Sequence, residues 1–159
     1  MNVKSPPGDG YGWEKVSCGC SYVTVDPKHR RQGRMNIHDA IRYVIRVQHL
    51  FGFDPTRPRN KPMRSIYNRI QSRLRLAGCK EKLEFFVGIG TCLDCLGVDV
   101  FFRCGKRFVT ADLYAGLRKR KGGKVRADIV LSRSDFITNK HYQIGDRIAQ
   151  MLLCPPTEV

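Results

Sequence analysis

Acidic residues are scarce in this sequence. Asp and Glu number 14 against 29 Lys and Arg, which gives a formal net charge of +15. The imbalance is concentrated in two segments: residues 57–75 carry seven basic residues and no acid, and residues 103–126 carry nine with Asp112 as the single acid. Clustered positive charge attracts polyanions through their phosphate groups. We therefore expect a nucleic acid, DNA in particular, as the partner; a basic protein that is merely soluble or binds acidic lipid is the alternative.

Long apolar runs are missing as well. Hydrophobic residues make up 42% of the chain, yet no stretch approaches the roughly 18 apolar residues of a membrane span. Residues 1–15 contain neither the apolar segment nor the cleavage pattern of a signal peptide. These absences favour a soluble, cytoplasmic protein with no membrane partner. They leave the oligomeric state open.

Metal-binding histidine patterns are also absent, since the four histidines show neither HxH nor HExxH spacing. The seven cysteines are an odd number without a signal peptide, which indicates thiols rather than disulfides. Cys92 and Cys95 form a CxxC, and Cys18 and Cys20 form a CxC that would complete a four-thiolate zinc site. Because 71 residues separate the two halves, we expect buried reduced thiols there rather than structural zinc.

The length of 159 residues is that of one domain with its own core. Three regions are expected within the domain 1–159. Residues 1–35 form an N-terminal arm and a basic turn, residues 36–78 form two helices, and residues 83–153 form a sheet and a C-terminal helix.

Apolar spacing predicts the two helices. The first covers residues 37–50, with Asn36 as its N-cap. The second covers residues 62–77 and ends at Gly78. Its expected buried stripe consists of Met63, Ile66, Ile70 and Leu74. Arg64 and Arg75 lie on another face and are predicted to contact phosphates, although a solvated basic face is an equal alternative.

From residue 83 the period changes to that of strands, predicted over residues 83–90, 97–104, 106–114 and 124–131. Cys104 to Lys106 provide a hairpin turn between the second and third strands. A helix over residues 140–153 closes the chain. The expected fold is therefore α/β, a small mixed sheet with a central β-hairpin flanked by helices.

Two aspartates interrupt the central hairpin. Asp99 lies near the start of one strand and Asp112 near the end of the next, so a tight turn brings them side by side. Convergent carboxylates repel one another unless a cation neutralises them, and Mg²⁺ or Mn²⁺ uses such ligands together with water and phosphate oxygens. The alternative is structural: Asp99 caps a turn or pairs with Arg103 or Arg107, and Asp112 pairs with a basic residue after it.

The run GTCLDCLGVDVFFRCGKRFVTADL, followed by RADIVL, resembles the core of the PD-(D/E)XK nuclease superfamily. In that superfamily a hairpin supplies an aspartate and then an acid-x-lysine motif. Asp99 matches the first acid and Asp112 the second, and the resemblance extends over residues 83–153. It implies a restriction-endonuclease-like core and a metal-dependent nuclease, in which both aspartates bind Mg²⁺ or Mn²⁺ and phosphodiester bonds of nucleic acid are hydrolysed.

The sequence departs from that pattern at Tyr114, where the superfamily has lysine. The lysine would orient and help to deprotonate the attacking water. The segment after Tyr114 offers three candidates for this role, Lys119, Lys121 and Lys124. Two arginines among them are expected to contact nucleic acid, Arg118 and Arg120. If no lysine reaches the site, the alternative is a non-catalytic nucleic-acid-binding protein on the same fold.

Members of the superfamily often carry a further acid on the helix before the sheet, but residues 62–77 contain none. Glu81, Glu84 and Asp94 are the nearest choices.

A separate similarity leads to a third hypothesis: the segment YQIGDRIAQMLL at 142–153 is similar to a short segment of the trimeric dUTPase family. That similarity implies a nucleotide hydrolase, whereas the same residues also fit an ordinary capped helix.

Overall fold

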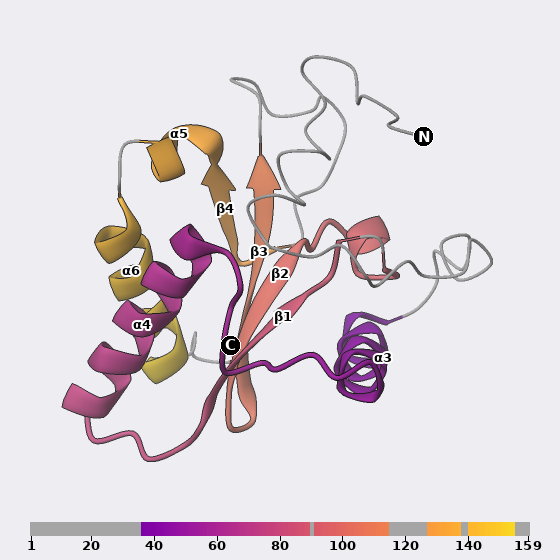
Figure 1. Cartoon of the computed structure of the whole chain (residues 1–159), viewed down its shortest axis with the longest axis horizontal. Helices are drawn as coiled ribbons and strands as arrows, with labels where there is room; N and C mark the ends of the chain where they lie inside the picture. The colour runs from indigo at the N-terminus through magenta and orange to yellow at the C-terminus, as the bar shows by residue number, and fades with distance from the viewer. Residues whose placement is uncertain (1–35, 90, 115–126, 138–139, 155–159) are drawn as a thin grey trace.

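Helices cover both faces of a four-stranded sheet in the computed structural model, which describes residues 36–89, 91–114, 127–137 and 140–154 (Figure 1). The helical elements are α3 (Ile37–Leu50), α4 (Lys61–Leu76), the 3₁₀ turn η1 (Asp94–Leu96), α5 (Arg133–Ile137) and α6 (His141–Leu153). The strands are β1 (Leu83–Val87), β2 (Val100–Cys104), β3 (Arg107–Tyr114) and β4 (Ile129–Ser132). The predicted mixed α/β fold is confirmed. The predicted arm at 1–35 lies outside the described residues.

The sheet has the order β1-β2-β3-β4. β1, β2 and β3 are antiparallel neighbours, and β4 runs parallel to β3. Cys104 pairs with Arg107 across a two-residue turn. Gly105 has a φ of +61° in that turn, a left-handed conformation that glycine adopts without steric cost. The central hairpin predicted from the sequence is therefore present, and its turn is at the predicted place.

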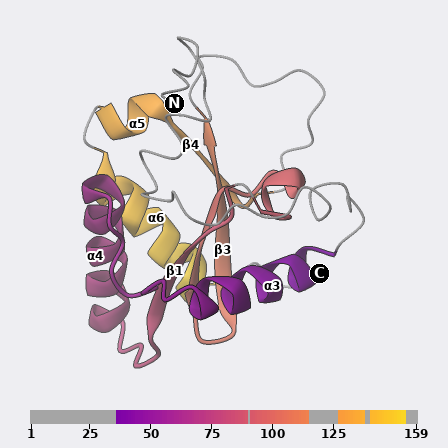
Figure 2. The same cartoon turned by 45° about the vertical axis from the view of Figure 1, so that its right-hand side comes forward.

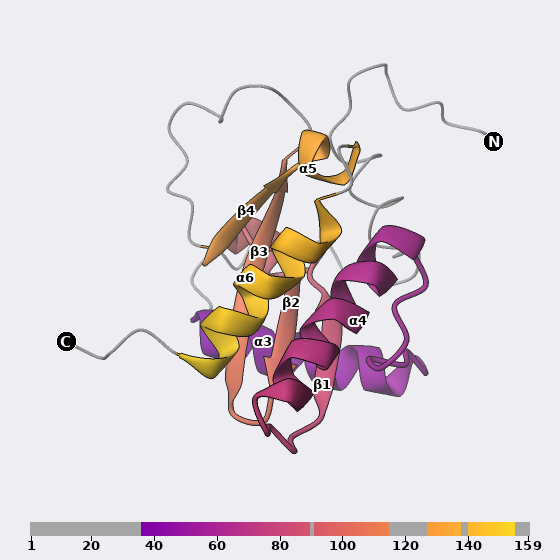
Figure 3. The same ribbon diagram turned by 90° about the vertical axis from the view of Figure 1, so that its left-hand side faces the viewer.

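Each face of the sheet packs against its own helices (Figures 2 and 3). α4 and α6 lie side by side on one face, where Phe85 and Phe102 are fully buried. α3 crosses the other face and packs on Phe86 and Phe101. Full burial of one such side chain contributes about 1.5–3 kcal/mol, so these aromatic residues of β1 and β2 anchor both layers.

The outer edge of β1 is covered rather than exposed. The side-chain amide of Gln48 on α3 donates to the carbonyl of Val87 and accepts from its N–H. The N–H of Phe85 donates to the carbonyl of Pro55, in the connection between α3 and α4, at 2.8 Å. These bonds satisfy edge groups that would otherwise invite pairing with another chain. They also explain why a polar residue, Gln48, occupies the buried stripe of a helix.

The two N-terminal helices match their predictions closely. Asn36 caps α3 by accepting a hydrogen bond from the His38 N–H at 2.8 Å. The stripe predicted for α4, Met63, Ile66, Ile70 and Leu74, is buried. The structure also contains η1 and α5, which were not predicted. Among the described residues, no helix combines the length and apolar character needed to cross a bilayer.

Candidate metal centre at the aspartate end of the sheet

Asp99 and Asp112 lie at the same end of the sheet: Asp112 is in β3, and Asp99, which was predicted to lie within a strand, directly precedes β2. Val100 of β2 pairs with Ala111 of β3, and the two aspartates are the residues next to this pair along the chain. We call this region the aspartate end. The β2–β3 hairpin turn lies at the opposite end of the same strands (Figure 1).

Asp99 is held through its backbone and its side chain. Its N–H donates to the Ala111 carbonyl at 2.9 Å, and its carbonyl accepts from the N–H groups of Gly88 and Ile89 at 2.6 and 3.1 Å. Its Oδ2 accepts from the Leu113 N–H at 2.7 Å, and the residue is only 3% exposed. The bonds to Ala111 and Leu113 fix the carboxylate beside the β3 backbone on both sides of Asp112.

Asp112 is half-buried on the opposite face of β3 from Ala111 and Leu113, which pack against α4 and α6. In the part of the chain that the structure describes, its carboxylate makes no hydrogen bond or ion pair. Partners for this carboxylate were expected in the basic residues that follow it, and residues 115–126 lie outside the described ranges. Asp112 is thus the less buried of the two aspartates.

The two arginines proposed as partners of Asp99 have other roles. Arg103 donates two hydrogen bonds to Glu84 Oε1, at 2.7 and 3.1 Å. Arg107 donates to the carbonyls of Leu152 and Leu153 at the end of α6, both at 3.0 Å. Both arginines therefore fasten neighbouring elements to the central hairpin.

Thr110 and Asp128 form a clasp between β3 and the start of β4, which the sequence did not reveal. Asp128 Oδ2 accepts from the Thr110 N–H at 2.8 Å and from its hydroxyl at 3.0 Å. The Thr110 hydroxyl oxygen in turn accepts from the Asp128 N–H at 3.0 Å. Asp128 stood in the quoted RADIVL segment, but only the β3–β4 register shows that it meets Thr110, two residues before Asp112.

Tyr114 ends β3, two residues after Asp112. Its hydroxyl is buried and has no hydrogen-bond partner in the described ranges. The residues proposed to replace the missing lysine or to contact nucleic acid beside it, Lys119, Lys121, Lys124, Arg118 and Arg120, lie outside the described residues.

The three further acids are distributed differently. Asp94 begins η1, in the connection from β1 to β2 that leads to Asp99. Glu84 forms an ion pair with Arg103, the residue opposite it on β2. Glu81 lies beside Gly105 at the hairpin turn, the other end of the sheet. Asp94 alone of the three is therefore in a segment that reaches the aspartate end.

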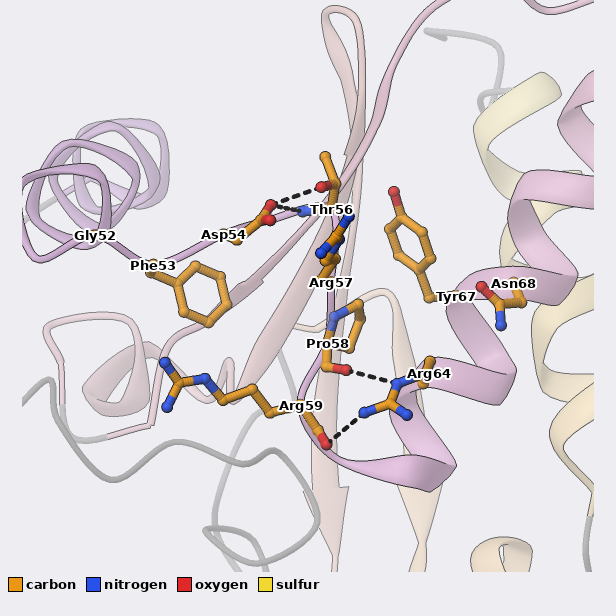
Figure 4. A pocket seen from close by; sticks show the side chains of 10 residues that line it. All are labelled: Gly52, Phe53, Asp54, Thr56, Arg57, Pro58, Arg59, Arg64, Tyr67 and Asn68. Atoms are coloured by element: carbon orange, nitrogen blue, oxygen red, sulfur yellow. Dashed lines mark hydrogen bonds between the residues drawn. The ribbon is translucent and has the colours of Figure 1, made fainter.

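The predicted basic face of α4 borders two adjoining hollows. The first, of about 500 Å³, lies between the start of α4 and the α3–α4 connection and is lined by Arg57, Arg59 and Arg64 (Figure 4). The second, of about 580 Å³, shares Thr56, Tyr67 and Asn68 with it and continues past Arg75. Asp54, the acid of the first hollow, accepts from the Thr56 hydroxyl and N–H at 2.6 and 2.9 Å, and the hydroxyl bond is the main cause of a lowered Asp54 pKa.

Arg64 and Arg75 differ within this face. The Arg64 guanidinium donates to the carbonyls of Pro58 and Arg59 at 3.2 and 3.0 Å, so it holds the α3–α4 connection (Figure 4). Arg75 is exposed in the last turn of α4. The structure thus assigns Arg64 a structural contact that the sequence did not show.

The cysteines of the proposed zinc pattern are only partly described. Cys92 is a buried thiol whose Sγ lies 4.0 Å from the Ala40 carbonyl oxygen on α3. Cys18 and Cys20 lie outside the described residues. Comparison of the chain with protein-family models, curated proteins and solved structures gives no match.

Proposed function

We propose that this protein is a metal-dependent nuclease with a restriction-endonuclease-like core, in which Asp99 and Asp112 bind Mg²⁺ or Mn²⁺. The observation that carries the proposal is the position of the Asp99 carboxylate, hydrogen-bonded to the Leu113 N–H beside Asp112. A β-hairpin that brings two carboxylates to one end of a sheet is the arrangement that the resemblance to PD-(D/E)XK nucleases implies.

The two carboxylates have complementary properties for this role. Asp99 is held by three backbone hydrogen bonds and one to its side chain, whereas Asp112 is half-buried. Hard divalent cations prefer such oxygen ligands and complete their coordination with water and phosphate. When bound, the metal supplies a hydroxide near neutral pH and neutralises charge on the phosphate.

Nucleic acid is the proposed substrate because of the distribution of charge. Arg57, Arg59 and Arg75 line the hollows along α4, and such residues bind phosphates without reading base sequence. Arg118 and Arg120 are proposed to contact the same polymer near the site. One of Lys119, Lys121 and Lys124 is proposed to position the attacking water.

The test is cleavage of a panel of DNA and RNA structures in Mg²⁺, Mn²⁺ or EDTA. We expect the wild type to cleave at least one DNA in the presence of Mn²⁺. Asp112→Asn is expected to lower the cleavage rate at least about a hundredfold. Substitution of a residue that only hydrogen-bonds to a metal ligand already lowers activity about 10–100-fold, and loss of a ligand itself should cost more. Asp39→Asn is the matched control because Asp39 is an exposed carboxylate on α3 whose contact is a 3.8 Å ion pair with Arg42.

A second candidate is a nucleic-acid-binding protein without catalytic activity, and Tyr114 favours it. A tyrosine with a buried hydroxyl stands where the superfamily has its lysine. This candidate predicts no cleavage with any divalent ion, and an affinity that falls steeply with salt in both wild type and Asp112→Asn. Cleavage by the wild type that Asp112→Asn abolishes would eliminate it.

A further inference from the structure

A second group of potential ligands lies at the hairpin turn, at the other end of the sheet. Cys79 and Glu81 lie in the connection from α4 to β1, and Cys104 is the last residue of β2. The two Sγ atoms are 3.5 Å apart, and a carboxylate oxygen of Glu81 lies within 4.8 Å of both. In the described part of the chain, these residues form the one group of three or more His, Cys, Asp or Glu side chains with this proximity.

The backbone fixes Cys104 and leaves room for the Glu81 side chain. Cys104 is 4% exposed, and its position is fixed by pairing with Leu83 on one side and Arg107 on the other. Glu81 lies directly over the turn: a Cβ on Gly105 would come within 1.9 Å of Glu81 Oε2. The absence of a side chain at Gly105 is therefore what lets the Glu81 carboxylate lie close to Cys104.

Distances distinguish metal binding from disulfide formation. Two Zn–S bonds of about 2.3 Å at the tetrahedral angle place the sulfurs about 3.8 Å apart, which differs from the observed 3.5 Å by only about 0.3 Å. A disulfide of about 2.05 Å requires the sulfurs to approach by about 1.5 Å, with one thiol fixed in the sheet. The observed geometry is thus nearer to that of two ligands of one ion.

We propose that Cys79, Cys104 and Glu81 bind one Zn²⁺, with water in the fourth tetrahedral position. Thiolate ligands select zinc over hard cations such as Mg²⁺. On binding, each thiol loses its proton to solvent and forms a Zn–S bond, and the carboxylate provides the third ligand. Two thiolates, one carboxylate and Zn²⁺ carry a net charge of −1, and Arg107, whose charge acts on Cys104, offsets it.

The site has an entry path and a structural consequence. Cys79 and Glu81 line the second hollow along α4, so an ion can reach them from solvent. Burial, together with the hydrogen bond to Cys79, raises the pKa of Cys104 to about 12. Bound zinc would tie the end of α4 to the β2–β3 hairpin.

The test is titration of the full chain with Zn²⁺ against a chromophoric chelator, in the presence of a non-thiol reductant, and with Co²⁺ as a spectroscopic probe. We expect one Zn²⁺ per chain and thiolate-to-cobalt charge-transfer absorption in the wild type. Cys79→Ser is expected to remove the absorption and raise the Kd at least about tenfold, and Glu81→Gln is expected to raise it by less. Both positions are at least partly exposed, so both variants are expected to keep the fold, as circular dichroism would check.

Two controls make the assignment specific. Cys154→Ser removes an exposed thiol at the end of α6 and is expected to bind zinc like the wild type. A Cys18→Ser/Cys20→Ser double variant removes the competing thiol pair and is also expected to retain the site. The proposal is overturned if the wild type binds no Zn²⁺, if folded Cys79→Ser binds it with wild-type affinity, or if only the Cys18/Cys20 variant loses it.

Discussion

The two ends of the sheet offer different chemistry on the same pair of strands. At the aspartate end lie the carboxylates of Asp99, directly before β2, and of Asp112 in β3. At the hairpin end, Cys104 meets Cys79 and Glu81. Oxygen ligands suit Mg²⁺ or Mn²⁺ and thiolates suit Zn²⁺, so the two proposed sites would favour different ions. The type of donor atom therefore distinguishes the two ends of the sheet.

Each end has a glycine that lies close to a neighbouring group, and the two glycines differ in what an added side chain would meet. A Cβ on Gly88, at the aspartate end, would lie 2.7 Å from the Val98 carbonyl oxygen, which is backbone. A Cβ on Gly105, at the hairpin end, would meet the end of the Glu81 side chain, which can move. We therefore expect the aspartate end to be the less tolerant of substitution.

The largest expected effect on stability is that of Gly88→Ala. The added methyl must displace the backbone that carries Asp99, and overpacking of this kind costs up to about 3 kcal/mol. Urea denaturation of the variant would measure the loss in the free energy of unfolding. A loss no larger than that of Gly105→Ala would contradict the difference between the two ends.

Asp99→Ala is expected to have the next largest effect on stability. It leaves the buried Leu113 N–H without its acceptor, which costs about 2 kcal/mol, whereas Asp112→Ala removes no hydrogen bond in the described structure and is expected to cost less than about 0.5 kcal/mol. Asp99→Asn keeps a side-chain oxygen and is the matched control. Equal losses for the two alanine variants, by chemical denaturation, would show that Asp99 is not the structural anchor of this end.

Gly105→Ala is expected to cost about 1 kcal/mol, because alanine must adopt a positive φ there. It should also displace Glu81 and weaken Zn²⁺ binding to the level of Glu81→Gln. Gly105→Asn, which tolerates the left-handed region better, separates the two effects: it should recover stability but not zinc affinity. Unchanged zinc affinity in both variants would remove Glu81 from the proposed site.

The smallest expected effect on stability is that of the ion pair between α4 and α6, the two helices on one face of the sheet. Arg69 donates to both Asp146 oxygens, at 2.7 and 3.2 Å, and this hydrogen bonding lowers the pKa of Asp146 below its usual 3.8. A lowered carboxyl pKa stabilises the fold above pH 3.8, and this stabilisation is lost as the pH falls through the folded-state value. Wild type and Asp146→Asn should therefore differ in unfolding midpoint near neutral pH and converge in acid; a constant difference would argue against the ion pair.

Much of the fold could be predicted from local pattern. α3 begins and ends where its apolar spacing and Asn36 cap indicated, and Gly105 marked the hairpin turn. The short α5 was missed because five residues carry no period, although the Ser132 and Asp135 side chains reveal its start. Asp135 accepts from the Ser132 N–H and hydroxyl, at 2.8 and 3.0 Å, and donates its own N–H to the Ser132 hydroxyl oxygen, a capping pair that the sequence displays.

The sites were less predictable because they depend on strand register. The proximity of Asp99 and Asp112 followed from hairpin geometry, but the bond from Leu113 to Asp99 requires the backbone to be known. Cys79 and Cys104 are separated by 25 positions, and their contact depends on how the chain turns from α4 into β1. Thr110 and Asp128 meet only through the parallel β3–β4 pairing.

The most direct test of the central claim is Mn²⁺ binding at the aspartate end, followed by electron paramagnetic resonance with and without a short DNA duplex. We predict that the wild type binds one Mn²⁺ and that Asp112→Asn and Asp99→Asn each raise the Kd at least about tenfold. Cys79→Ser, at the hairpin end, should bind Mn²⁺ like the wild type. Wild-type Mn²⁺ affinity in folded Asp112→Asn would show that Asp112 is not a metal ligand.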